Sequence, residues 1–389
     1  MNEFKLTYVV IFIVFLAGCS SNVTDDRSPD EVTISTVSTS GGYVGGSIHS
    51  TATSRIDYRT PSVVLINTFF ATDRNHYMDY RGKNSYGESR SEISYGMTKV
   101  SIPMLHHKKG VVESPSLWRF EFRENPDRHV VLLDVVQLKN DSFFNKINDH
   151  LKEGRRSAFI FVHGFNVTFE DAARRTAQMT YDLKFKGIPI FYSWPSSGSM
   201  LKYPSDEGNV EWSKNNIKYF LRDFLKKTQA ENVYLLAHSM GNRALIDAYI
   251  DVENEYPNLG RKIKEVILAA PDIDAEVFKN DIVPALAGIG KPVTLYASSE
   301  DIPLKLSKEF HGGYPRAGDS GNSIIIAPGI ETVDVTGVTS GFWGHSYLTE
   351  EKTILTDLFY IINHDIRANE RASLNPINTR RGMYWKLIR

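Results

Sequence analysis

The sequence has a single cysteine, Cys19, among its 389 residues. One cysteine cannot form an intramolecular disulfide, so a fold held together by disulfides is excluded. The histidines and the cysteine show no metal-site spacing, and we expect neither a metal nor any other cofactor. The formal net charge is −1. Nucleic-acid binding needs a basic surface, so this charge argues against a nucleic-acid partner.

Long hydrophobic runs are also scarce. The run at residues 8–18 is short for a membrane-spanning helix but suits the apolar part of a signal peptide. It ends in Leu16-Ala17-Gly18-Cys19, which resembles the lipobox of bacterial lipoproteins, where the chain is cut before a cysteine that receives lipid. The resemblance implies a signal peptide over residues 1–18 and membrane attachment through lipidated Cys19. An uncleaved N-terminal anchor is the alternative.

The residue after Cys19 bears on which membrane the lipoprotein is sorted to. Ser20 follows it, and in Gram-negative lipoproteins the lack of Asp at this position implies sorting to the outer membrane, facing the periplasm. The inner membrane stays open. Residues 19–60 are rich in Ser, Thr, Gly and Asp, so we expect the lipidated cysteine and a flexible tether there. A coil of about 40 residues spans roughly 35 Å.

Residues 61–389 have the pattern of one folded domain. Residues 63–69, 95–102 and 129–136 are expected to be antiparallel strands, because no long helix separates them. We assign Asp73, Arg74 and the polar residues 75–90 to a long surface loop. From about residue 140 strand and helix alternate, which predicts an α/β fold with a mostly parallel sheet and helices on both faces. The expected strands are 157–162, 188–193, 233–237, 264–270, 292–297 and 331–336; the expected helices are 168–186, 210–227, 275–286, 349–362 and one from residue 241.

One strand in this series passes directly into a helix. The apolar residues 233–237 are followed by His238, Ser239 and Met240, and a helix is expected from Gly241. This pattern predicts a nucleophile elbow, which lifts the serine hydroxyl above the sheet edge. The following N–H lies at a helix start, where it can meet an oxyanion. Ala237 and Gly241 supply the small residues that the tight turn requires; an ordinary structural turn is the alternative.

Several short segments together resemble a known family. They are residues 161–166 (Phe-Val-His-Gly-Phe-Asn), 191–195, 236–241, 344–347 and 384–387. From about residue 62 onward the chain resembles an α/β hydrolase and, more narrowly, the uncharacterised hydrolase family DUF900. The resemblance implies the α/β-hydrolase fold, with antiparallel strands at the N-terminal side of the sheet. It also implies the chain order nucleophile, acid, histidine.

This order selects among the histidines after Ser239. His345 lies between the last expected strand and the final helix, where a loop can bring its ring to Ser239, so it is the predicted base. His311 comes before that strand and His364 ends the final helix, so neither is favoured as the base. Within the loop of residues 163–166, we expect His163 to be a brace rather than a catalyst.

The acid and the oxyanion donors follow from the same resemblance. Asp301, after the strand at 292–297, is the preferred acid, and Asp272, one strand earlier, is the alternative. Otherwise Asp272 is expected to support its turn or to cap the helix that starts near residue 275. Asp274 and Glu300 are held in reserve. The oxyanion donors are expected to be the N–H groups of Met240 and Phe165.

The predicted activity is hydrolysis of a carboxylic ester, of a small molecule or a lipid, through an acyl-enzyme on Ser239. Residues 271–291 leave room for only one helix, so no large cap is expected. Residues 194–211 and 298–328 are then left to frame an open entrance. Transfer of the acyl group to an acceptor other than water would use the same residues, and an inactive binding lipoprotein of the same fold also remains open.

Overall fold

The computed structural model describes residues 62–388 except 81, 116–120, 122 and 339–351. The predicted signal peptide, the tether and Cys19 therefore lie outside the described residues, and so does His345. In the ranges that are described, no helix is long and apolar enough to span a bilayer.

The folded chain opens with three strands, β1 (Val63–Met78), β2 (Asn84–Pro103) and β3 (Val131–Leu138), which pair antiparallel as predicted. The long loop predicted over residues 73–90 is wrong. Strands β1 and β2 both continue into this segment and form a hairpin, with register shifts on either side of Arg74. The hairpin tip is largely exposed, so its polar residues lack the apolar alternation that marks a strand. Arg74 lies inside β1 and is only 2% exposed.

Beyond β3, strands and helices alternate as predicted. The strands are β4 (Ser157–Val162), β5 (Ile188–Ser193), β6 (Asn232–His238), β7 (Ile263–Ala269), β8 (Val293–Ala297), β9 (Ile330–Asp334), β10 (Leu374–Thr379) and β11 (Gly382–Leu387). The helices and short helical turns are α1 (Asn140–Glu153), α2 (Phe169–Asp182), η2 (Met200–Lys202), α3 (Tyr203–Lys227), α4 (Gly241–Glu255), α5 (Pro257–Gly260), α6 (Ala275–Val277), η3 (Phe278–Ile282), α7 (Val283–Ile289), α8 (Ile302–Phe310), η4 (Gly321–Ser323), α10 (Lys352–His364) and η6 (Ala368–Glu370).

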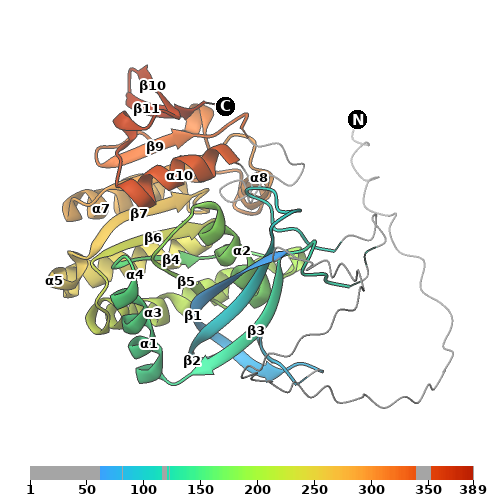
Figure 1. Cartoon of the computed structure of the whole chain (residues 1–389). Helices are drawn as coiled ribbons and strands as arrows, with labels where there is room; N and C mark the ends of the chain where they lie inside the picture. Colours follow the sequence, from blue (N-terminus) through green and yellow to red (C-terminus); the bar gives the residue numbers. More distant parts are fainter. Residues whose placement is uncertain (1–61, 81, 116–120, 122, 339–351, 389) are drawn as a thin grey trace, which may run out of the picture. The chain divides into compact units, whose positions relative to one another are not determined.

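The described strands form one sheet in the order β10-β11-β9-β8-β7-β6-β4-β5-β1-β2-β3 (Figure 1). Strands β4 to β9 are parallel neighbours, and β1 also runs parallel to β5. The predicted sheet, mostly parallel with antiparallel strands at its N-terminal side, is confirmed. Strand β6 lies in the middle, and the carboxyl ends of its parallel neighbours meet at the edge where α/β proteins form their sites.

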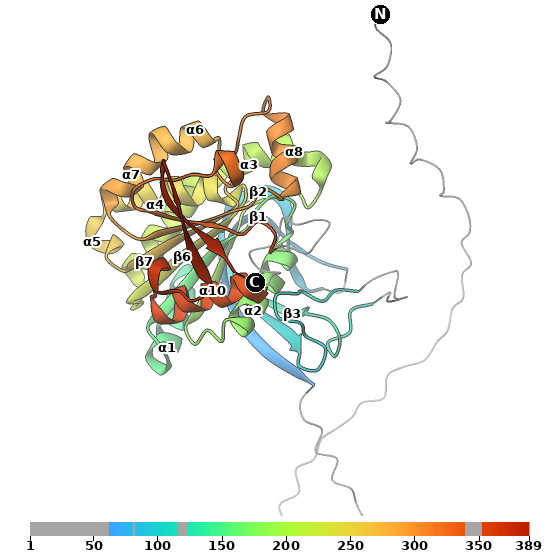
Figure 2. The same cartoon turned by 90° about the horizontal axis from the view of Figure 1, so that it is seen from above.

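Helices cover both faces of the sheet, as predicted. In β6 the side chains of Val233 and Leu235 enter one buried cluster, with residues of α1, α3, α4 and α7. Those of Tyr234 and Leu236 enter the other, with residues of α2 and α10. Figure 2 shows α4 and α7 on one side of β6 and β7, and α10 on the other. A strand buried on both faces explains the continuous apolar run before Ser239.

Two helix starts bear on the predictions. Helix α2 begins with the predicted cap, because Thr168 Oγ1 accepts a hydrogen bond from the N–H of Asp171 at 3.1 Å. The suggestion that Asp272 caps the helix near residue 275 is wrong. Asp274 caps α6 by accepting from two N–H groups of its first turn. The carboxylate of Asp272 is engaged elsewhere, beside Ser239.

Candidate active site

Ser239 occupies a strained turn between β6 and α4. The strand ends at His238, the helix begins at Gly241, and Ser239 between them has φ of +50°. This left-handed conformation costs a non-glycine residue about 1–3 kcal/mol, so the surroundings must hold it. The N–H of Ser239 donates to the carbonyl of Ala269 at 2.9 Å, and Asn242 Nδ2 donates to the carbonyl of Ser239 at 2.8 Å. The predicted sharp strand-to-helix turn is therefore present.

Small residues are required where the loop after β4, residues 163–168, meets this turn. A Cβ atom on Gly241 would lie 2.3 Å from the carbonyl oxygen of His163. A Cβ atom on Gly164 would lie 2.9 Å from the Cβ of Ser239. Both distances are shorter than carbon atoms tolerate, so neither glycine can be replaced without moving the backbone. The loop after β4 thus packs directly against Ser239.

Met240 follows Ser239 in the chain, and Phe165 lies in the loop that packs against Ser239. Met240 directly precedes α4, so its N–H belongs to a helix start, where N–H groups have no partner within the helix. Phe165 belongs to the loop that packs on Ser239 and lines the same cavity. The next residue, Asn166, has φ of +59°, so this loop also makes a left-handed turn. The oxyanion role of the two N–H groups stays a prediction.

The cavity beside Ser239 is narrow, with a volume of about 30 Å³. This is room for one or two water molecules or a small chemical group. Phe310 is 68% exposed and stacks on Tyr203 with a centroid distance of 5.7 Å. The segments predicted to frame the site do supply most of the wall. The lining residues are Phe165, Tyr203, Ser239, Asp272, Pro303, Leu306, Ser307 and Phe310.

Asp301, the predicted acid, lies at the start of α8. Its carboxylate accepts a hydrogen bond from the N–H of Leu304 at 2.8 Å, and its side chain is buried. It follows β8, which is two strands from β6 in the sheet. This is the place where the hydrolase chain order expects the acid. The catalytic role stays a prediction, because the partner ring of His345 lies outside the described residues.

Asp272, the alternative acid, is committed to a buried network of hydrogen bonds and ion pairs. Its carboxylate accepts from Arg316 Nε at 2.8 Å and from Ser307 Oγ at 2.5 Å. The hydroxyl of Tyr203 donates to its other oxygen, and Arg243 lies 3.4 Å from that same oxygen. The described structure therefore gives this carboxylate two arginines and two hydroxyls as partners. This environment resembles a structural ion pair more than a catalytic one.

The pKa of Asp272 reflects this network. Burial alone would raise it, but the positive charges of Arg243 and Arg316 outweigh burial and lower it below its usual value. Burial and the neighbouring carboxylate raise the pKa of the Tyr203 hydroxyl. Asp272 therefore stays charged and Tyr203 stays neutral at physiological pH. The cavity wall next to Ser239 holds a fixed donor–acceptor pair rather than a group that exchanges protons.

The other histidines considered from the sequence have structural surroundings. His163 braces its loop as predicted: Nδ1 is 2.8 Å from the carbonyl oxygen of Gly164, and Nε2 is 3.0 Å from Ser193 Oγ. Burial, helped by the charge of Arg74, lowers the pKa of His163 to about 3, so the ring is neutral. His311 lies with Nδ1 2.7 Å from the carbonyl oxygen of Ser307. His364 is exposed at the end of α10.

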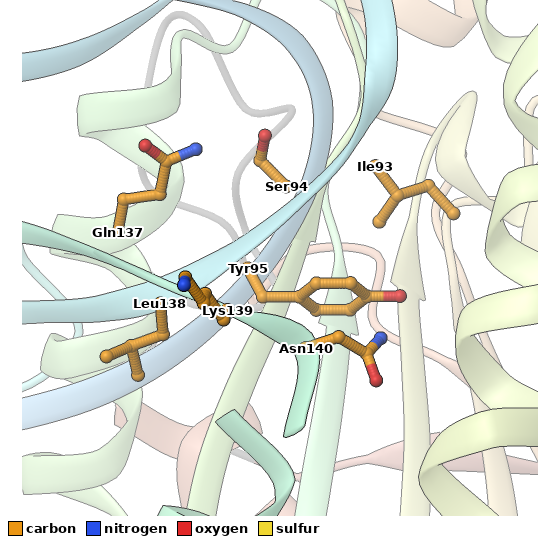
Figure 3. A pocket seen from close by; sticks show the side chains of 7 residues that line it. All are labelled: Ile93, Ser94, Tyr95, Gln137, Leu138, Lys139 and Asn140. Atoms are coloured by element: carbon orange, nitrogen blue, oxygen red, sulfur yellow. The ribbon is translucent and has the colours of Figure 1, made fainter. Parts of the chain in front are cut away.

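A second hollow, of about 580 Å³, shares no lining residue with the cavity at Ser239. It lies where β2, β3 and the start of α1 meet, and Figure 3 shows the side chains around it. None of them is a carboxylate, a histidine or a thiol. The lining residues are Ile93, Ser94, Tyr95, Gln137, Leu138, Lys139 and Asn140.

The sequence did not single out several residues that surround Ser239. Tyr203 and Ser307 belong to helices α3 and α8; their hydroxyls lie 2.9 Å apart, and both donate to Asp272. Arg74 was assigned to a surface loop, yet it reaches the loop after β4 from inside β1. These contacts join residues from 35 to 104 positions apart in the chain. No local pattern marks such partners.

Comparison with known proteins agrees with the observed fold. Residues 139–361 match the family described as "Alpha/beta hydrolase of unknown function (DUF900)". Among solved structures, an esterase of Pyrobaculum calidifontis is 12% identical, covers 53% of this chain and 76% of its own, and gives a TM-score of 0.32. A "predicted CIB-like hydrolase" of Thermoplasma acidophilum is 18% identical, with 58% and 90% covered and a TM-score of 0.32. Fungal esterases of Rhizomucor miehei reach 13% identity, 80% and 86% coverage and a TM-score of 0.34. These structural matches are too distant to inform activity, and no curated protein matches the sequence.

Proposed function

Because this chain belongs to the DUF900 family of α/β hydrolases, whose function is unknown, we propose that it is a serine hydrolase of carboxylic esters. The observation that carries the proposal is the backbone at Ser239. A non-glycine residue at φ of +50°, between a buried strand and a helix start, is costly and needs a reason. A nucleophile held at the sheet edge beside a cavity supplies one.

The proposed reaction assigns a role to each candidate residue. Ser239 Oγ attacks the ester carbonyl while His345 takes its proton, and Asp301 orients the imidazole and stabilises its charged form. The N–H groups of Met240 and Phe165 stabilise the oxyanion. The C–O bond then breaks, and His345 returns the proton to the leaving alcohol. Water, activated by the same histidine, releases the acid from the acyl-enzyme.

The small volume of the cavity favours a substrate with a short acyl group. About 30 Å³ beside Ser239 has room for the methyl of an acetyl ester, and a butyryl chain would have to widen the cavity, whose wall includes Leu306 and Phe310. Both side chains are partly exposed, at 41% and 68%, so the alcohol part of the ester can extend past them into solvent. We therefore propose short-chain esters as substrates.

Ester hydrolysis by the purified folded domain tests the proposal. Wild-type protein should release p-nitrophenol from the acetyl ester faster than from the butyryl ester. Ser239→Ala should lower turnover by about 10⁴ or more, because nucleophile and base act as a unit. Chelators should leave the rate unchanged. Activity that survives Ser239→Ala but not chelation would show that the mechanism is wrong.

We also propose that lipidated Cys19 attaches the domain to a membrane of the cell envelope. The membrane we propose is the outer membrane, with the domain facing the periplasm. The proposal is supported by the Leu16-Ala17-Gly18-Cys19 sequence and by Ser20. Several acyl chains on one cysteine give stable attachment where a single chain gives only marginal binding. A domain held on a tether in this way would meet small esters or lipid esters near the membrane surface.

A further inference from the structure

Arg74 is a buried cation whose hydrogen-bond acceptors, within the part of the chain that the structure describes, are all neutral. It is 2% exposed, and its guanidinium reaches three separate segments of the chain. The partners are Ser193 Oγ (2.8 Å), the carbonyls of Gly87 (3.0 Å), Ser196 (2.8 Å) and Val167 (2.7 Å), and His163 Nε2 (3.4 Å). A guanidinium has five N–H donors in a fixed plane, and these contacts use its whole edge.

Burial of a guanidinium in this way costs free energy of folding. A cation removed from water and hydrogen-bonded to neutral groups gains less compensation for desolvation than one in a direct ion pair. Burial accordingly lowers the pKa of Arg74 to about 10, although the charges of nearby carboxylates, Glu170 and then Asp73, act in the other direction. An apolar side chain of the same volume would avoid this cost but would leave the carbonyls of Gly87, Ser196 and Val167 without this donor, so the residue is tied to the arrangement of these three segments.

Two of the contacts of Arg74 go to the loop after β4. They hold this loop at both ends, through the ring of His163 and the carbonyl of Val167. Between these two points lie Gly164, which packs on the Cβ of Ser239, and Phe165, which lines the cavity. Displacement of either end would therefore move the backbone that faces the nucleophile.

We propose that Arg74 is a positioning residue that fixes the loop after β4, residues 163–168, against Ser239. This inference rests on the serine hydrolase function proposed above and adds a residue to it. Arg74 comes from β1, outside the stretch 139–361 that matches the family. The hairpin of β1 and β2 would then support catalysis through Arg74, in addition to extending the sheet. Its role is to hold donors in place before the oxyanion forms, which is where preorganisation contributes most.

The test is Arg74→Lys, which keeps the positive charge but loses the planar fork that joins the three segments. Arg371→Lys is the matched control. Arg371 is also a buried arginine, but it pairs with Asp357 at 2.8 Å and Glu331 at 3.2 Å, on α10 and β9. Both variants should lower the melting temperature. Only Arg74→Lys should lower kcat, by about 30- to 100-fold with KM within about threefold, because loop displacements near 1 Å cost about this much.

The reaction of Ser239 with a fluorophosphonate gives a second readout. Phosphonylation also passes through an oxyanion, so its rate constant in Arg74→Lys should fall in proportion to kcat/KM. The proposal is overturned if Arg74→Lys, like Arg371→Lys, loses thermal stability but keeps kcat within twofold of wild type at 25 °C. Should Arg74→Lys fail to fold, Ser193→Ala decides: it removes one acceptor of Arg74 and should lower kcat about 3- to 10-fold, and an unchanged kcat overturns the proposal. A wild-type protein that neither cleaves esters nor reacts at Ser239 would instead refute the serine hydrolase function itself.

Discussion

Two aspartates near Ser239 can be distinguished by the same substitution, because asparagine keeps the shape of aspartate and removes its charge. Asp301→Asn should abolish catalysis and spare the fold, whereas Asp272→Asn should weaken the fold and spare most of catalysis. The contrast follows from the contacts of the two carboxylates. It also decides which aspartate is the acid, the point that the chain order left open.

The cost at Asp272 can be derived from its network. The carboxylate is buried and faces both Arg316 and Arg243, at 2.8 and 3.4 Å. Loss of one partner of a buried ion pair costs about 3–5 kcal/mol, because the remaining charge is left without compensation. A folded domain of roughly 330 residues has an unfolding entropy near 0.7 kcal/mol/K, so the melting temperature should fall by about 4–7 °C.

The cost at Asp301 has a different origin. Its carboxylate caps α8 through the N–H of Leu304, and asparagine caps a helix as well as aspartate does. Stability should therefore change by less than 1 kcal/mol, or about 1 °C in melting temperature. The imidazole of His345, however, would lose the group that orients it. Turnover should fall by up to about 10⁴.

The assay compares the two variants with one acetyl ester and one thermal melt each. We expect Asp272→Asn to keep turnover within about tenfold of wild type at a temperature well below its melting point. Asp301→Asn should keep the melting temperature and lose turnover. The reverse outcome, a crippled Asp272→Asn with an active Asp301→Asn, would place the acid one strand earlier and refute the assignment.

Three further predictions follow from other parts of the chain. Gly241→Ala should prevent stable folding of the site, because its Cβ would lie 2.3 Å from the backbone oxygen of His163; circular dichroism and solubility would reveal this, and a folded, active variant would contradict it. Burial lowers the pKa of His107, but hydrogen bonds to Asp182 and Glu113 outweigh burial. The pKa is therefore raised to about 9 in the folded protein, compared with about 6.5 in the unfolded chain. Its stabilisation is therefore complete below pH 6.5 and lost as pH rises through 9, so the melting temperature should fall by a few degrees from pH 7 to 10, and His107→Gln should remove this part of the fall. Cys19→Ser should release the domain from membranes or block its maturation, and unchanged mass with unchanged membrane fractionation would contradict the lipoprotein assignment.

The sequence predicted those features that are encoded locally. Residues 233–241 carry the strand, the tight turn and the helix start in one stretch, so the backbone around Ser239 could be anticipated from neighbouring side chains. The alternation of apolar strands and amphipathic helices likewise predicted the parallel sheet. Thr168 and Asp171, three residues apart, predicted the start of α2.

Features that depend on distant residues could not be predicted in this way. The hairpin at residues 75–90 is stabilised by pairing between strands, and its exposed polar side chains resemble those of a loop. The role suggested for Asp272 as a helix cap considered only its neighbours in sequence. Its actual partners include Tyr203 and Arg316, 69 and 44 positions away. Burial of Arg74 depends on carbonyls from three segments that meet only in the folded chain.

Covalent labelling of Ser239 tests the central claim most directly. The folded domain is treated with a fluorophosphonate, and the adduct is located by peptide mass spectrometry, with Ser239→Ala as the control. The account predicts one adduct per chain, on Ser239, lost in the control together with ester hydrolysis. Ester hydrolysis by a protein that carries no adduct, or an adduct on another residue in an active enzyme, would contradict the claim that Ser239 is the nucleophile.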